Sequence, residues 1–170
     1  HGARVAYVGP EPALHGWMTP TEAVRLATSL IGLAPDEAAR RTREALTSVG
    51  MEPADAGRSL RQAGPAIVER TALAAALVGE PEILLLDEPL RSVAADERAA
   101  ILRLRDRRRR TVLLASRTPG RDVALATHVM LVRAGRVTVL APVSELEAAG
   151  LPATRDGIAT LADGRAPIPQ

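Results

Sequence analysis

Two adjacent carboxylates, Asp87 and Glu88, are the side chains of this chain best suited to do chemistry. They stand near the end of residues 82–89, EILLLDEP, directly after a continuous apolar run. Such a run is typical of a strand buried on both faces of a parallel sheet, and open α/β sheets bind ligands at the carboxyl ends of their strands. At a nucleotide site Asp87 would hold Mg²⁺, and Glu88 would orient or deprotonate an attacking water. The alternative is a strand that simply ends in two acids.

The basic residues argue against a complete phosphate site. The chain has 22 Lys plus Arg, and all of them are arginine. A Walker A loop places a lysine on the β- and γ-phosphates after a glycine-rich turn. The sequence contains no such loop. The carboxylates of a nucleotide site are therefore present without the loop that binds the phosphates.

Composition sets further bounds. With 170 residues and 46% hydrophobic content, the chain is one globular domain or part of one. The absence of cysteine excludes disulfides and thiolate metal sites, and no apolar stretch reaches the ~18 residues that span a bilayer. The chain begins at His1 without Met, so we expect it to be processed, tagged or truncated. The arginine-rich run 105–110 carries no interleaved aromatic residues, which favours a solvated helix end over a nucleic-acid site.

The order of predicted elements indicates the architecture. A strand over 4–8 is followed by helices that begin at Thr19-Pro20 and at Pro35 and by a mostly apolar helix over 66–78. In the first of these helices, one apolar face is expected to comprise Val24, Ala27, Leu30 and Ile31. Strands over 82–87 and 111–116 flank a helix over 95–109. This order favours a parallel α/β sheet of the P-loop NTPase type, present in part, with an inserted α-helical subdomain over about 19–78. Residues 128–140 predict a C-terminal β-hairpin around Ala134-Gly135. We expect one domain over 1–150 and a tail over 151–170.

Four segments carry a resemblance to a known family. Residues 71–89 (TALAAALVGEPEILLLDEP), 111–116 (TVLLAS), 126–146 (ATHVMLVRAGRVTVLAPVSEL) and 5–23 (VAYVGPEPALHGWMTPTEA) occur in the order expected of that family. In these segments the chain resembles the ATP-binding domain of ABC transporters, with a lean toward the exporter branch. The resemblance implies Mg²⁺ and ATP as cofactors, Asp87 as the Walker B metal ligand and Glu88 as the catalytic base.

The chain departs from the family pattern in its N-terminal half. The first strands and the Walker A loop of the family have no counterpart. The Q-loop glutamine falls at Pro10, which offers neither a side-chain hydrogen bond nor a backbone donor, although Glu11 beside it could substitute. The signature motif aligns with residues 63–67, AGPAI, which lack its serine hydroxyl.

Two later motifs also differ. The D-loop aspartate falls at Ala94, and Asp96 would need a shift of register. The switch histidine falls at Arg117, which can pair with a phosphate but cannot shuttle a proton near neutral pH. Arg117 is therefore the candidate for binding the nucleotide, and a solvated arginine without a role is the alternative.

Three functions follow from the resemblance. The first is an incomplete or degenerate ATP-binding subunit of an ABC exporter, peripheral at the cytoplasmic face of the membrane, which pairs with a permease and with a second nucleotide-binding domain. The second is a pseudo-ATPase that scaffolds or regulates a complex with an active homologue. The third, a DNA-repair, chromosome-structuring or translation member of the superfamily, is disfavoured by the short helical insert without heptads. Alone, we expect the chain to be inactive, to expose an apolar surface and to self-associate.

Overall fold

The computed structural model describes residues 4–103, 110–152 and 154–163. Chain contacts divide the molecule into two units, His1–Ala115 and Ser116–Gln170, and each is described by itself. None of the helices within the described ranges is long and apolar enough to cross a membrane. The arginine run at 105–109 and the last seven residues lie outside the described ranges.

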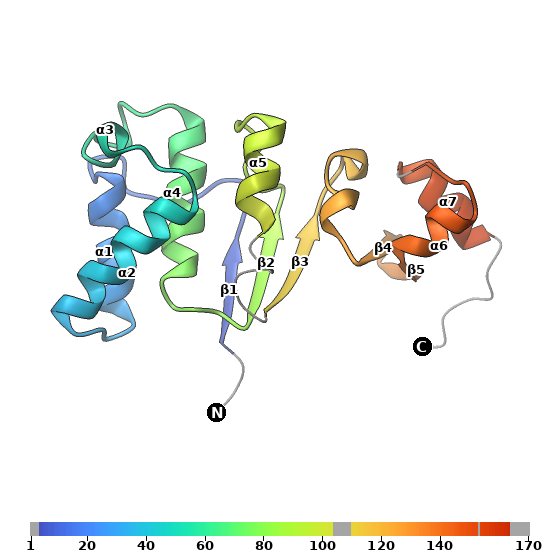
Figure 1. Ribbon diagram of the computed structural model, residues 1–170, viewed down its shortest axis with the longest axis horizontal. Helices are drawn as coiled ribbons and strands as arrows, with labels where there is room; N and C mark the ends of the chain where they lie inside the picture. The colour runs from blue at the N-terminus through green and yellow to red at the C-terminus, as the bar shows by residue number, and fades with distance from the viewer. Residues whose placement is uncertain (1–3, 104–109, 153, 164–170) are drawn as a thin grey trace. The chain divides into compact units, whose positions relative to one another are not determined.

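The first unit is built on a three-stranded parallel sheet (Figure 1). Its strands, β1 (Val5–Val8), β2 (Ile83–Asp87) and β3 (Thr111–Ala115), lie side by side in that order. In the register, Val8 lies opposite Leu86, and Leu86 lies opposite Leu114. The predicted parallel α/β sheet is confirmed, and β2, the strand that carries the acids, is its central member.

The connection from β1 to β2 carries the helical insert (Figure 1). It contains α1 (Pro20–Leu30), α2 (Pro35–Ser48), the single turn α3 (Pro53–Ala56) and α4 (Pro65–Leu77). The connection from β2 to β3 carries α5, Ala95–Leu102. The predicted start of α1 is confirmed: Thr19 caps the helix, Pro20 takes its first position, and Glu22 completes a capping box.

The buried face of α1 differs from the prediction. The pattern placed Val24, Ala27, Leu30 and Ile31 on one inward face, but the structure buries Val24 with Ala23 and Thr28 and leaves Leu30 79% exposed. Leu30 lies six positions after Val24, which turns Leu30 about 120° away around the helix. Ile31 is the C-cap residue of α1 and is half exposed.

On α2, pairs of arginine and glutamate side chains bond to one another along the helix. Arg40 and Arg41 donate to the Glu37 carboxylate, with Arg40 Nε at 2.9 Å from Oε2. Hydrogen bonds from Arg40 and then Arg41 lower the pKa of Glu37 from 4.5 to about 2. The inner face buries Ala38, Ala45 and Leu46 together with the polar residue Thr42.

In the part of the first unit that the structure describes, helices cover one face of the sheet. Val8, Leu84 and Leu86 point to the covered face and are buried, whereas Val5, Tyr7 and Leu113 on the opposite face are 57%, 62% and 46% exposed. The strands lie in the order β1-β2-β3, so both connections run in the same direction along the sheet. Because such parallel crossovers are right-handed, the helices of both connections lie on the same face. The expectation of an exposed apolar surface is therefore confirmed, and the surface is this open face of the sheet.

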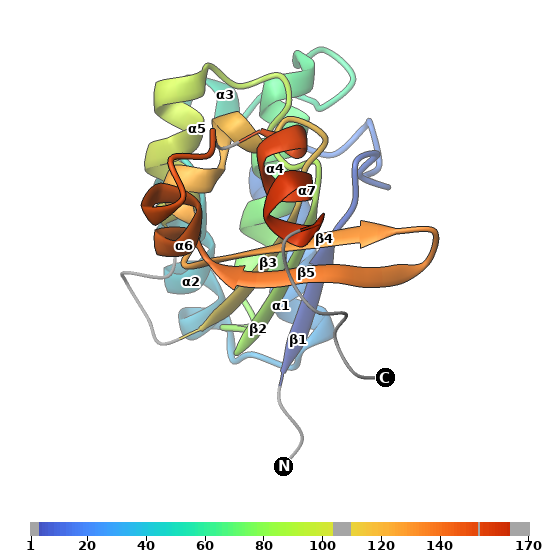
Figure 2. The same cartoon turned by 90° about the vertical axis from the view of Figure 1, so that its right-hand side faces the viewer.

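The second unit is a β-hairpin packed against two helices (Figure 2). Strands β4 (His128–Arg133) and β5 (Arg136–Pro142) pair antiparallel. The predicted turn is confirmed: Ala134 and Gly135 both have positive φ, as a type I′ turn requires. The unit also contains two short 3₁₀ turns, η2 (Pro119–Arg121) and η3 (Val123–Leu125), and the helix α6, Val143–Ala148.

The expectation that residues 151–170 form a tail is wrong for their first part. Helix α7 spans Arg155–Asp163, and its Ile158 is 5% exposed. Ile158 packs with Val129, Ala141 and Leu146 in the core of the second unit. The pattern missed α7 because Gly157 interrupts the helical sequence, and only the apolar surface of the hairpin gives Ile158 a place to be buried.

Candidate functional site

The structure places Asp87 and Glu88 where the sequence predicted, at the carboxyl end of the central strand. Asp87 is the last residue of β2 and lies opposite Ala115 of β3. The backbone N–H of Glu88 donates to the carbonyl of Ala115 at 3.0 Å, so the sheet pairing continues one residue past the strand. Both acids are half-buried. The carboxyl ends of parallel strands form the ligand-binding edge of such sheets.

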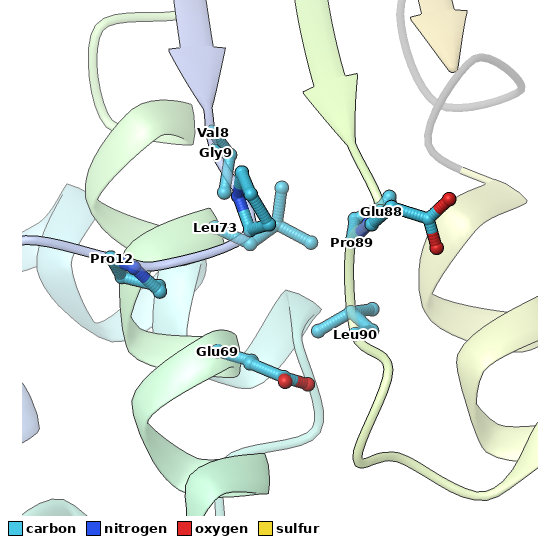
Figure 3. Close-up of a pocket in the computed structure, with 9 residues that line it drawn as sticks. Val8, Gly9, Pro12, Glu69, Leu73, Glu88, Pro89 and Leu90 are labelled. Atoms are coloured by element: carbon cyan, nitrogen blue, oxygen red, sulfur yellow. The ribbon is translucent and has the colours of Figure 1, made fainter. Parts of the chain in front are cut away.

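A shallow hollow lies beside the acid pair (Figure 3). The end of β1 and the segment after it contribute residues to the wall, as do α4 and the segment after Asp87; the lining residues are Val8, Gly9, Pro10, Pro12, Glu69, Leu73, Glu88, Pro89 and Leu90. Figure 3 shows the Glu88 carboxylate pointing away from Glu69 and Leu73. The two acids of the hollow, Glu69 and Glu88, therefore do not converge on one point.

The segment 88–92, here called the acid loop, has an unusual backbone. Glu88 and Leu90 have φ of 48° and 54°, on either side of Pro89. A left-handed conformation costs a residue with a side chain about 1–2 kcal/mol, so contacts elsewhere must hold the acid loop in place. Leu90 supplies one such contact, because its side chain is buried.

Polar contacts fix the rest of the acid loop. Ser92 donates from its backbone N–H and its hydroxyl to the Glu69 carboxylate, at 2.9 and 3.0 Å. Arg91 donates to the carbonyl of Pro10 at 2.9 Å. The buried Arg98 donates from Nε to the carbonyl of Pro89, also at 2.9 Å. Sequence reasoning missed Glu69 and Arg98, because no spacing rule connects them to partners that lie 23 and 9 residues away.

The Q-loop and signature positions take structural roles. Pro10 lines the hollow and accepts the Arg91 hydrogen bond through its carbonyl. Glu11, the expected substitute for the glutamine, is exposed and is not among the residues that line the hollow. Gly64 is the N-cap residue of α4, and Pro65 is its first helical residue. The segment 63–67 therefore begins a helix without a hydroxyl group.

The remaining two motif positions lie apart from the hollow lining. Ala94 is the N-cap residue of α5, and Asp96 is an exposed residue of its first turn. Arg117 is exposed and belongs to the second unit, whereas the acid pair belongs to the first. Its pairing with a phosphate stays a prediction.

The acid pair fits a magnesium ion that a nucleotide helps to hold. Among the described residues, no group of three or more His, Cys, Asp or Glu side chains could hold a metal ion. Mg²⁺ is commonly bound by one or two carboxylates together with phosphates and water, a role that Asp87 can fill. The hollow offers few donors to a phosphate, because its residues Pro10, Pro12 and Pro89 carry no N–H.

The fold is that of the ATPase domain of ABC proteins, a P-loop NTPase fold. The structure matches a solved chain described as the dimeric, post-hydrolysis state of the ATP-binding cassette MJ0796 bound to ADP and Pi, with a TM-score of 0.74. The match covers 83% of this chain and 63% of the other, at 20% identity. This likeness establishes the fold.

Sequence comparison gives relatives that are named as import ATP-binding proteins. The chain is 37% identical over 144 residues to the taurine import ATP-binding protein TauB of Mesorhizobium japonicum, covering 83% of this chain and 53% of the relative. It is 33% identical over 132 residues to the aliphatic sulfonates import ATP-binding protein SsuB of Corynebacterium glutamicum, covering 75% and 54%. No protein-family model matches the sequence.

These findings support the resemblance that the motifs indicated: the chain is similar in sequence to import ATP-binding proteins and has the fold of an ATP-binding cassette. The lean toward the exporter branch is not supported, because both relatives are named for import. The chain spans about half the length of these relatives.

Proposed function

We propose that this chain is part of the ATP-binding component of an ABC-type import system. The observation that carries the proposal is the acid pair at the carboxyl end of the central parallel strand, in a chain 37% identical to a taurine import ATP-binding protein. In this function ATP hydrolysis drives uptake. The names of the relatives favour a small sulfonated compound as the transported substrate.

The residues of the chain divide the work at such a site. Asp87 would supply the protein ligand to Mg²⁺, and Glu88 would position or deprotonate the attacking water. We expect the phosphates to be held by residues outside this sequence, because the sequence contains no glycine-rich loop with a lysine. Three residues of the hollow beside Glu88 are also prolines, which carry no N–H donor. Arg117 would add a positive charge toward the phosphates.

The proposal implies partners and a place in the cell. A second nucleotide-binding domain would complete the site. ATP hydrolysis there would be coupled to transport by a membrane permease. The chain would then lie at the cytoplasmic face of the membrane. No nucleic acid is expected to bind. The alternative of an inactive pseudo-ATPase that scaffolds a complex gains no support from the relatives, and the following experiment separates it from the proposal.

The test is Mg²⁺-ATP binding and hydrolysis by the full natural polypeptide that carries this sequence. We expect calorimetry to show micromolar binding that weakens in Asp87→Ala. In Glu88→Gln we expect binding to persist while hydrolysis slows by about 100-fold or more, because the general base is lost. The 170-residue chain alone should give no heat down to millimolar affinity.

Two results would contradict the proposal. Absence of Mg²⁺-ATP binding by the full polypeptide would favour the pseudo-ATPase. Hydrolysis that is unchanged in Glu88→Gln would remove Glu88 from the mechanism.

A separate outcome concerns the isolated chain. Micromolar binding by the chain alone, lost in Asp87→Ala, would show that a phosphate-binding loop exists within this sequence.

A further inference from the structure

The orientation of Glu88 depends on an unfavourable backbone conformation. Glu88 and Leu90 both lie in the left-handed region, and neither is a glycine. Residues of this kind keep such a conformation only where their surroundings impose it. Rotation of Glu88 back to the common region would change the direction of its Cα–Cβ bond and move its carboxylate. Contacts that fix the segment between Glu88 and Leu90 therefore influence where the carboxylate lies.

Arg98 makes a contact at that point. It stands on α5, and its side chain is almost fully buried, at 5% exposure. Its Nε donates to the carbonyl of Pro89 at 2.9 Å. The backbone N–H of the same residue donates to the carbonyl of Ala94 at 2.8 Å, in the first turn of the helix. Arg98 thus joins the middle of the acid loop to a rigid helical turn.

The two ends of the acid loop are held by other groups. At the start, the Glu88 N–H is bonded to the carbonyl of Ala115. At the end, Glu69 of α4 accepts two hydrogen bonds from Ser92. With both ends fixed, the Pro89 carbonyl lies in the segment between the two left-handed residues, and Arg98 is the side chain that binds it.

We propose that Arg98 is a positioning residue for Glu88, acting through the carbonyl of Pro89. The proposal rests on the proposed function, in which Glu88 handles the attacking water. Arg98 itself touches neither metal nor nucleotide in this scheme. Its loss should misplace the Glu88 carboxylate and lower kcat, while the affinity for Mg²⁺-ATP stays close to that of the parent.

A matched pair of variants isolates the hydrogen bond. Glutamine places an N–H₂ donor at the same position along the side chain as the Nε of arginine, whereas methionine has similar length and no donor. Arg98→Gln and Arg98→Met both remove the buried positive charge, so any cost of losing the charge is common to the two. They differ in the amide group: glutamine keeps an N–H donor for the Pro89 carbonyl, and methionine has none.

The first measurement needs no nucleotide. Hydrogen exchange of a peptide covering 86–93, in the full natural polypeptide, reports on the amides of Glu88 and Ser92. We expect exchange in Arg98→Met to be faster by about ten-fold, the equivalent of one lost hydrogen bond, and exchange in Arg98→Gln to stay near the parent rate. Equal exchange in the two variants would overturn the proposal.

The second measurement is steady-state hydrolysis of Mg²⁺-ATP. We expect Arg98→Met to lower kcat by about ten-fold or more with KM changed less than about two-fold, and Arg98→Gln to recover most of kcat. A difference in exchange with equal kcat would overturn the positioning role while leaving the proposed function intact. A parent polypeptide that neither binds nor hydrolyses ATP would overturn the proposed function and, with it, the role of Arg98 in catalysis, whereas the exchange result would still report on the acid loop itself.

Discussion

Arg70 shows how one buried side chain can join separate parts of the first unit. It is 6% exposed and donates from Nη1 to the carbonyls of Val49 and Gly50, at 2.8 and 2.9 Å. Its Nη2 pairs with Glu97 of α5 at 2.5 Å. A buried guanidinium is tolerated only when its donors are satisfied. Arg70 therefore stabilises the end of α2 and ties that end to the helix that follows the acid loop.

A substitution at Gly50 tests the role of the Arg70 hydrogen bonds. Gly50 follows α2 with φ of 66°, and an added Cβ would lie 2.6 Å from Arg70 Nη1. Gly32 is a matched control, because it follows α1 with φ of 74° and a Cβ there would meet nothing within 4 Å. We expect Gly32→Ala to cost about 1–2 kcal/mol from backbone strain alone, and Gly50→Ala about 1–2 kcal/mol more from displaced hydrogen bonds of Arg70. Urea denaturation of both variants measures the difference, and equal costs would show that Arg70 moves aside without loss.

At the scale of elements, the second unit depends on α7 for its core. A two-stranded hairpin is marginal in water by itself, and the apolar residues on one face of β4 and β5 need a cover. Leu146 of α6 and Ile158 of α7 supply that cover, together with Val129 and Ala141 of the strands. The residues expected to form a tail thus complete a small hydrophobic core.

Ile158→Ala should therefore destabilise the second unit by about 2–5 kcal/mol, the usual range for a buried isoleucine cut to alanine. Thr160→Ala is the control, because Thr160 is an exposed residue of the same helix. Hydrogen exchange of the β4 and β5 amides would follow the loss of stability in this unit. Unchanged protection in Ile158→Ala would mean that α7 does not stabilise the hairpin in solution.

At the scale of the whole molecule, the open face of the sheet is the feature that favours self-association of the isolated chain. Parallel sheets are covered on both faces in nearly all known folds, and here Val5, Tyr7 and Leu113 remain exposed on one face. An exposed apolar surface of this kind favours association.

We expect the purified 170-residue chain to self-associate through this face. Sedimentation velocity over a range of concentrations should show species larger than the monomer, and Leu113→Gln should shift the distribution toward the monomer. Leu30→Gln, which removes an equally large exposed side chain at the end of α1, should have little effect. A chain that remains monomeric and melts cooperatively would count against an open sheet face.

The sequence by itself determined most of the elements, although not α7, and the position of the acids. Local patterns suffice for these features: the capping box at Thr19, the apolar run before Asp87 and the Ala134-Gly135 turn each specify a conformation from residues a few positions apart. The order of the elements then predicted a parallel sheet with a helical insert.

Only the tertiary structure decided what holds the acids in place. The left-handed backbone of Glu88, the hydrogen bond from Arg98 and the contact of Glu69 with Ser92 depend on groups brought together by the sheet and by α4 and α5. The burial of Ile158 likewise depends on the hairpin surface beside it. Contacts between residues far apart in the chain leave no periodic trace in one sequence, because their spacing is set by the connections between elements and not by the geometry of any single helix or strand.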